Sequence, residues 1–302
     1  MERYASDKGR RTIESRLRSM FRHTGASHPD QLSTRRLLAW VTEPGLANNT
    51  VRARLAVAQC FCRWCVAMGY TEYDPCAQFP NLNRQYPTTY GKVQSKNPAR
   101  RLSHAEAYGQ LVRACQDGTD AGLRDECIIR LGLSGMRRGE IASLTIASVD
   151  HLPSIQWIGK GNKPRHMTTG AALTTVLGEW VRLRLANGHC TGPEDTLFVP
   201  RTHSGRMNWT LATTGTNTLN QTIERTVIRR ARQAGLGHVT PHDLRRSAAD
   251  ILHNTIAEDG GHVFDLLDIQ KILGHSDPAT TMRCYIDPAD TAVLDRAAKY
   301  LD

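Results

Sequence analysis

The sequence lacks several features of membrane, secreted and nucleotide-dependent proteins. No apolar run in its 302 residues approaches the roughly 20 residues that span a bilayer. The first residues, from Met1 to Lys8, carry charges with no apolar core behind them, so we expect no secretory signal and a cytoplasmic location. There is also no P-loop, Rossmann glycine signature, H-E-x-x-H helix or carboxylate cluster suited to a two-metal nuclease. Any catalysis therefore has to come from another set of side chains.

The composition is that of a soluble, basic protein with room for two domains. Apolar residues make up 40% of the chain and charged residues 23%, as in ordinary globular proteins. The net charge of +10 and the pI of about 9.4 favour a polyanionic partner such as nucleic acid. A ribosomal or membrane-surface protein can have the same charge balance, so charge alone does not identify the partner.

The cysteines invite a metal or redox interpretation. Cys60, Cys62 and Cys65 cluster, and the last two have C-x-x-C spacing. No second pair with matching spacing accompanies them, and the cluster lies inside a helical pattern from Val51 to Met68, whereas zinc ligands usually come from turns. We therefore expect no metal, and reduced thiols that fill a helix interface.

Residues 1–80 have the pattern of a compact helical domain. Apolar spacing predicts a first helix over 12–22, a second that begins at a Ser-Thr cap at 33–34, and a third that one of the residues 48–50 caps and Gly69 ends. Its basic side chains either meet DNA phosphates or form an ordinary solvated helix face. These side chains are Arg35, Arg36, Arg52, Arg54 and Arg63.

Residues 81–101 have the composition of an interdomain linker. They are rich in proline, glycine, lysine, arginine and asparagine and have almost no apolar side chains. A capping box of Ser103 and Glu106 then begins a second, mainly helical domain over 102–302.

One part of the second domain changes period. Residues 154–158 and 165–169 predict two strands around a lysine-rich turn, and 197–199 predicts another short strand. We therefore expect a mainly α fold with a small antiparallel β-sheet, in the α+β class. A basic helix over 216–234 has a polar face that either lies in a DNA major groove or is solvated. That face carries Asn217, Asn220, Arg225 and Arg229.

Six residues of the second domain suit attack on a phosphodiester. They are Arg137, Lys160, His242, Arg245, His275 and Tyr285. His242 and Arg245 stand three apart and share a helix face. Glu140 stands three residues after Arg137 at a predicted helix start, where its carboxylate can orient the guanidinium. An R-x-x-E pair alone is more often a surface ion pair, so only the combined set carries weight.

The order and context of these residues resemble the catalytic domain of tyrosine recombinases, the phage integrase family. The segment S-G-M-R-R-G-E matches the first arginine at Arg137 and the acidic helper at Glu140, and G-K-G-N-K matches the catalytic lysine at Lys160 rather than Lys163. T-P-H-D-L-R-R-S matches the H-x-x-R box. L-G-H-S and T-T-M-R-C-Y match the last histidine and the tyrosine nucleophile. The N-terminal helices are similar to the family's core-binding, SAM-like domain.

The resemblance implies a clamp of two domains around double-stranded DNA that needs no metal, ATP or other cofactor. Tyr285 attacks a phosphodiester to form a 3′-phosphotyrosyl link, and the two arginines neutralise the charge of the transition state. His242 accepts the tyrosine proton or holds the phosphate, and Lys160 protonates the departing 5′ oxygen. His275 adds a hydrogen bond to the phosphate.

The resemblance also implies an assembly on DNA. We expect a dimer on each short core site, a homotetramer for strand exchange, and a terminal helix over 291–302 that docks in its own or a neighbouring subunit. Residues 1–11 are too short for the extra arm-binding domain of some phage integrases, which favours a simple recombinase.

Two features depart from the pattern, and two other functions stay open. The gap from His242 to His275 contains a surplus at Thr255–His262, expected to be a surface loop, and Tyr285 follows His275 by ten residues. Tyr300 is rejected as nucleophile because it lacks the preceding G-H-S turn. A type IB topoisomerase-like nicking enzyme has the same residue set, and a DNA-binding regulator with a decayed site is the alternative outside catalysis.

Overall fold

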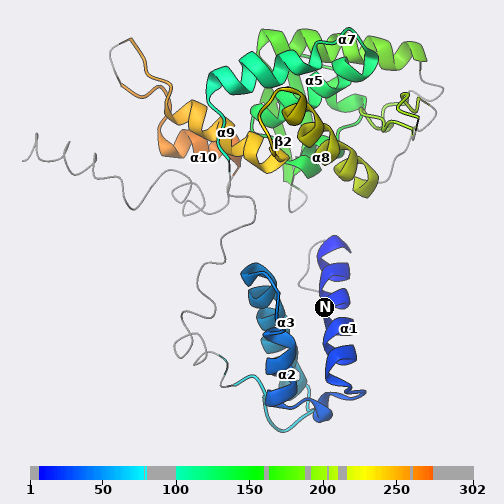
Figure 1. The fold of residues 1–302 in the computed structure, drawn as a ribbon, viewed down its shortest axis with the longest axis vertical. Helices are drawn as coiled ribbons and strands as arrows, with labels where there is room; N and C mark the ends of the chain where they lie inside the picture. Colours follow the sequence, from blue (N-terminus) through cyan, green and yellow to red (C-terminus); the bar gives the residue numbers. More distant parts are fainter. Residues whose placement is uncertain are drawn as a thin grey trace, which may run out of the picture. The chain divides into compact units, whose positions relative to one another are not determined.

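The computed structural model describes residues 7–77, 79, 100–159, 163–187, 192–202, 204–209, 216–258 and 261–274. The chain divides into two compact units, Met1–Pro98 and Ala99–Asp302 (Figure 1). The described residues are mainly helical with one two-stranded antiparallel sheet, which confirms the predicted fold class. None of the helices described is long and apolar enough to cross a membrane. Several predicted features lie outside the described residues: Lys160, His275, Tyr285, the helix over 291–302 and most of the linker.

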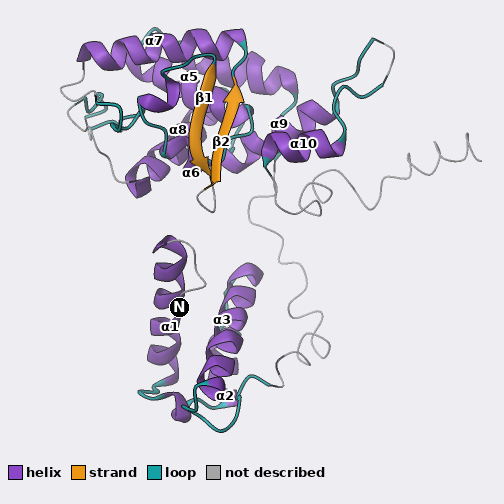
Figure 2. Ribbon diagram, turned by 180° about the vertical axis from the view of Figure 1, so that it is seen from behind, coloured by secondary structure: helices purple, strands orange, loops and turns teal. Residues whose placement is uncertain are grey.

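In the described part of the first unit, three helices contact one another (Figure 2). They are α1 (Asp7–Thr24), α2 (Thr34–Val41) and α3 (Asn48–Ala67), with a short 3-10 turn at Pro29–Gln31. Met20, Leu37, Trp40 and Ala58 form the centre of its core, each at 0% exposure. The three predicted helices are confirmed.

The ends of these helices follow local sequence rules with one exception. Ser33 caps α2 as predicted and accepts a hydrogen bond from the amide of Arg36 at 3.4 Å. Gly69, at φ +74°, follows α3 in a Schellman turn whose next amide, of Tyr70, bonds back to a carbonyl of the helix. The predicted cap of α3 was wrong by at least one residue, because its N-cap is Ala47, which has no side-chain acceptor.

The cysteine prediction holds for two of the three clustered residues. Cys62 and Cys65 are buried along α3 and free. Burial raises the pKa of Cys65 to about 11, so this thiol is neutral at physiological pH. Cys60 is exposed, so its predicted packing role was wrong.

The second unit is organised around the buried helix α5 (Asp120–Leu133). Helices α7, α8 and α9 pack on it (Figure 1). The elements are, in chain order, η2 (Ala105–Val112, π-helical), η3 (Arg113–Cys115), α5, α6 (Arg138–Ala142), η4 (Ala147–Val149), β1 (Ser154–Gly159), β2 (Lys163–Thr168), α7 (Ala171–Asn187), α8 (Thr216–Gln233), α9 (Pro241–His253) and α10 (Leu266–Leu273).

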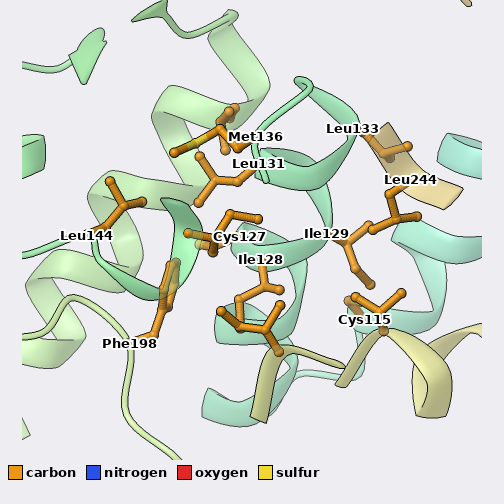
Figure 3. Packing of buried hydrophobic residues seen from close by; sticks show 14 of the residues in the cluster. Cys115, Cys127, Ile128, Ile129, Leu131, Leu133, Met136, Leu144, Phe198 and Leu244 are labelled. Atoms are coloured by element: carbon orange, nitrogen blue, oxygen red, sulfur yellow. The ribbon is translucent and has the colours of Figure 1, made fainter. Parts of the chain in front are cut away.

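A glycine sets the distance between α5 and α9. Figure 3 shows Leu244 of α9 beside Ile129 and Leu133 of α5. A Cβ added at Gly132 would lie 2.9 Å from Cδ1 and 3.3 Å from Cβ of Leu244, so a larger residue there would displace Leu244. This contact fixes the first turns of α9, which carry the H-x-x-R residues, against the core.

Two local predictions for this unit are confirmed and one is wrong. Ser103 and Glu106 exchange capping-box hydrogen bonds, and β1 and β2 form the expected hairpin with Trp157 opposite Arg165. Residues 197–199 are not a strand. Their apolar side chains are buried in the core, which accounts for the apolar run. The carbonyl oxygens of two of them accept hydrogen bonds from a tryptophan and an arginine side chain.

The surplus at Thr255–His262 is a short excursion between α9 and α10, drawn in orange in Figure 1. An isolated bridge pairs Ile256 with His262, and the amide of Val263 donates to the carbonyl of Thr255 at 3.0 Å. The His262 ring stacks on His253 with centroids 5.0 Å apart. The predicted surface loop is thus a small hairpin-like extension that leaves α9 and α10 in contact.

A buried ionic network joins α5 to α8. The carboxylate of Asp125, at 0% exposure, accepts hydrogen bonds from three arginines: Arg124, Arg229 and Arg230. Arg124 also donates to the carbonyl of Val199 at 2.8 Å, and Arg230 pairs with Asp117 at 2.8 Å. One carboxylate therefore compensates several cations in the interior.

We expect Asp125→Asn to destabilise the chain by about 3–5 kcal/mol, because it leaves buried guanidinium groups without their counter-charge. Asp120→Asn is the matched control, because Asp120 is exposed in the first turn of the same helix. The control should cost at most about 1 kcal/mol. Chemical denaturation of both variants measures the difference, and equal losses would contradict the assigned role of the network.

Candidate active site

The first element of the site is the start of α6, where Arg137 and Glu140 pair as the sequence predicts. Arg137 is the N-cap residue, and its backbone amide donates to Oε2 of Glu140 at 2.7 Å. Its Nη1 donates to Oε1 of the same carboxylate at 2.9 Å. Glu140 is buried at 5% exposure while the Arg137 side chain is 34% exposed. The carboxylate thus holds one edge of a guanidinium that still faces solvent.

The second element is the start of α9, which begins at a capping box. Thr240 and Asp243 exchange hydrogen bonds there, and proline occupies the first helical position. This fixes His242, which is exposed, and Arg245, which is 4% exposed, in the first and second turns of the helix. Arg245 donates through Nη1 to the carbonyl of Gly135, two residues before Arg137.

The third element is the carboxyl end of α10, where the guanidinium groups meet. Arg245 donates through Nη2 to the carbonyl of Leu273, and Arg137 donates through Nη2 to the next carbonyl, of Gly274, at 3.0 Å. The last carbonyls of a helix have no partner within the helix and carry its negative dipole end, so cations are favoured there. Two arginines that are 108 positions apart in the sequence are therefore held at consecutive peptide groups.

This end of α10 is also the segment that leads into His275. Gly274, at φ +62°, is the left-handed C-cap of the helix. His275 is the next residue and lies outside the described residues, as does Tyr285. The structure therefore brings together four predicted site residues, Arg137, Glu140, His242 and Arg245. The last described residue, Gly274, directly precedes a fifth, His275.

The electrostatics of the site lower the pKa of His242. The side chain is exposed in part, but partial desolvation of the imidazole is still the largest cause, and the positive charges of Arg246, Arg245 and Arg137 add to it. Asp243 acts in the opposite direction but does not cancel these effects. His242 is consequently a neutral imidazole at physiological pH and can accept a proton.

Sequence reasoning missed one residue of this cluster. Arg165 of β2 donates through Nη1 to Oε1 of Glu140 at 3.3 Å and through Nη2 to the carbonyl of Ile272 at 3.1 Å. Its Cζ lies 5.3 Å from the ring centre of Trp157, its partner in the hairpin register. The alternation of the hairpin and that pairing were the only signals of an inward-facing arginine, and a basic hairpin did not distinguish it from a solvated one.

The predicted DNA-contact residues separate into two groups. Five of them are exposed: Arg35, Arg36, Arg52, Arg63 and Arg225. Arg54 instead pairs with Glu43 at 2.7 Å, and Arg229 pairs with the buried Asp125. Asn220 is 8% exposed, and the side chain of Asn217 lies outside what the structure describes. Arg54 and Arg229 are thus held by ion pairs within their own units, and Asn220 is largely buried.

Among the described residues, one group has the spacing of metal ligands. Ligand atoms of Cys62, Asp74 and Cys76 lie within 4.8 Å of one another. The two sulfur atoms are 3.7 Å apart, and the hydrogen bond between the thiols together with burial raises the pKa of Cys76 far above its usual range. Among the described residues the group offers two thiols and one carboxylate, one ligand fewer than the four of a structural zinc site, so the absence of a metal stays an expectation.

Comparisons with known proteins agree with this geometry. The model of the phage integrase family matches residues 100–292. The tyrosine recombinase XerC of Corynebacterium efficiens is 32% identical over 273 residues, which is 87% of this chain and 77% of the relative.

Two solved structures have the same fold. The XerH recombinase bound to a palindromic difH substrate, in a post-cleavage complex, superposes with a TM-score of 0.63 at 19% identity, over 90% of this chain and 73% of that one. A lambda integrase tetramer bound to a Holliday junction gives 0.61 at 14% identity, over 92% and 74%. The chain therefore belongs to the phage integrase family and is a site-specific tyrosine recombinase, an enzyme that breaks and rejoins DNA.

Proposed function

We propose that the chain cleaves each DNA strand with Tyr285 and forms a 3′-phosphotyrosyl intermediate, with Arg137, Arg245 and His242 around the scissile phosphate. The observation that carries this proposal is the meeting of both arginines at consecutive carbonyls of Leu273 and Gly274. Desolvation and the charge of Arg246 lower the pKa of His242, and the charges of both arginines add to this, so the imidazole lies near them. Separate helices thus supply cations and a proton acceptor at one place.

The chemistry needs charge neutralisation first. A phosphodiester carries one negative charge, and attack on phosphorus places further charge on its non-bridging oxygens. A guanidinium has five N–H donors, and Arg137 uses two of its own for Glu140 and Gly274. The remaining donors on its exposed side suit a bidentate contact with phosphate oxygens. The carboxylate of Glu140 keeps that guanidinium oriented before DNA arrives, so less ordering is needed in the transition state.

The proton steps then balance. A phenol has an ordinary pKa near 10 and is a weak nucleophile at neutral pH, so Tyr285 must lose its proton as Oη bonds to phosphorus. The neutral imidazole of His242 accepts that proton. The bond from phosphorus to the 5′ oxygen breaks, and Lys160 donates a proton to that oxygen. His275 donates a hydrogen bond to the phosphate. The covalent link retains the energy of the phosphodiester, so the 5′-hydroxyl of another strand can reverse the attack without ATP.

The assembly proposed for this chain follows the relatives. The lambda integrase structure is a tetramer on a Holliday junction, and the XerH structure holds a palindromic site. We infer that this chain binds a short core site as a dimer, exchanges strands as a tetramer, and closes its two units around the duplex. The exposed arginines Arg35, Arg36, Arg52 and Arg63 on the first unit, and Arg225 on the second, suit phosphate contacts.

A nicked suicide substrate tests the proposed nucleophile. Cleavage near the nick releases a short oligonucleotide that carries the 5′-hydroxyl needed to rejoin the strand. The covalent complex therefore accumulates, and it migrates slowly on a denaturing gel. We expect this adduct with the wild-type chain, with Tyr300→Phe as control, and not with Tyr285→Phe.

Two outcomes would contradict the proposal. An adduct that persists in Tyr285→Phe would show that another residue attacks. No adduct with the wild-type chain on any DNA to which it binds specifically would favour a regulator that binds DNA without cleaving it. A recombination assay with two sites, run beside a relaxation assay on a supercoiled plasmid, separates strand exchange from topoisomerase activity.

The pH dependence of cleavage tests His242. Its pKa lies below the ordinary 6.5, so the imidazole stays neutral until the pH falls below this lowered pKa. The cleavage rate should decline only in that acidic range. Arg246→Gln removes the first cation that lowers this pKa, so we expect the acidic limb to move to higher pH. Single-turnover cleavage measured across pH, with the exposed Arg113→Gln as control, checks the direction. A limb that stays in place or moves to lower pH would contradict the assignment.

A further inference from the structure

We propose that Arg165 is a positioning residue for strand cleavage: it fixes the stem of the lysine hairpin against the arginine motif and the end of α10. This inference rests on the proposed function, because it concerns how Lys160 reaches the scissile phosphate. Arg165 itself touches none of the reacting atoms in the proposal.

The first part of the argument is the number of elements that one side chain joins. The guanidinium of Arg165 contacts the carboxylate of Glu140 on α6 and the carbonyls of Ile272 and Leu273 on α10, at 3.1 to 3.3 Å. The same group lies over the ring of Trp157 on β1. Its side chain is 20% exposed, and its hydrogen bonds to Glu140 and Leu273 are partly buried, whereas the one to Ile272 is exposed. Hairpin, arginine motif and α10 are thus connected through one residue.

The second part is the space kept for this side chain. A Cβ added at Gly274 would lie 2.4 Å from Cζ of Arg165, and one added at Gly159 would lie 2.8 Å from its Cδ. Both distances are too short for real atoms, so each glycine leaves room for the arginine. These two glycines stand immediately before two residues of the proposed catalytic set, Lys160 and His275.

The third part is what guanidinium geometry permits. A planar group with five donors can serve a carboxylate and two carbonyls at once, whereas a lysine ammonium is a single point with three donors. Glu140 also holds Arg137. Arg165 therefore ties the stem of the hairpin to the carboxylate that orients the first catalytic arginine. Losing it would leave the residues present but the hairpin free to shift, and a displacement of about 1 Å can cost about 100-fold in rate.

The test compares Arg165→Ala and Arg165→Lys with Arg182→Ala, a control that removes an exposed arginine from α7. We expect unchanged binding to core-site DNA for all three variants. Single-turnover cleavage should fall about 100-fold in both Arg165 variants and stay within twofold of wild type in the control. If Arg165→Ala does not fold, as judged by thermal melting, Arg165→Gln takes its place.

A substrate with sulfur in place of the bridging 5′ oxygen separates positioning from general damage. The thiolate leaves without a proton, so loss of the proton donor no longer slows cleavage. We expect this substrate to bring both Arg165→Ala and Lys160→Ala to within about tenfold of wild type, and the double variant to be no slower than Lys160→Ala on ordinary DNA.

Each result leads to a different conclusion. Wild-type cleavage by Arg165→Ala, or a double variant in which both losses add fully, overturns the positioning role while the proposed function stands. A Lys160→Ala variant that cleaves ordinary DNA normally, or gains nothing from the sulfur substrate, overturns the proposed role of the lysine and this inference with it.

Discussion

The second unit depends on one electrostatic constraint, the negative carboxyl end of α10 held among guanidinium groups. Arg137, Arg165 and Arg245 come from α6, β2 and α9, and each donates to a carbonyl among residues 272–274. The carbonyls need partners because the helix ends there, and the arginines need acceptors because they are partly or fully buried. The same hydrogen bonds meet both requirements, and they gather positive charge where we propose that the phosphate binds. Glu140 offsets part of this positive charge, and its carboxylate orients the guanidinium groups of Arg137 and Arg165.

The rest of the second unit keeps that cluster in place. Gly132 lets α9 pack closely on α5, and the network around Asp125 ties α8 to α5. Desolvation and the charge of Arg246 lower the pKa of His242, and Arg245 and Arg137 of the cluster add to this effect. In the proposed mechanism, fold stability and catalytic chemistry therefore use the same charges. An arginine that holds a helix end in the protein alone is already placed for a transition state that carries more negative charge than the substrate.

Much of this was predictable from the sequence where the signal was local. The cap at Ser33, the box of Ser103 and Glu106, the lysine hairpin and the pair of Arg137 with Glu140 all depend on residues within a few positions of one another. The strand predicted at 197–199 failed because burial and strand pairing produce the same apolar run. The contacts of Arg54, Arg229 and Asn220 could not be predicted from the sequence. An arginine that faces DNA and one that pairs with a carboxylate occupy the same positions in the sequence pattern of a helix. The role of Arg165 could not be predicted either, because its partners lie 25 and about 107 positions away in the sequence.

The central claim is that Arg137 and Arg245 act by neutralising charge on the scissile phosphate. The most direct measurement is cleavage of a core-site substrate in which a neutral methylphosphonate replaces that phosphate. Arg137→Ala and Arg245→Ala should be slow on ordinary DNA and recover most of the lost rate on the neutral substrate, because the charge that they offset is gone. Variants that remain equally slow on both substrates would contradict the account and leave these arginines a purely structural task at the end of α10.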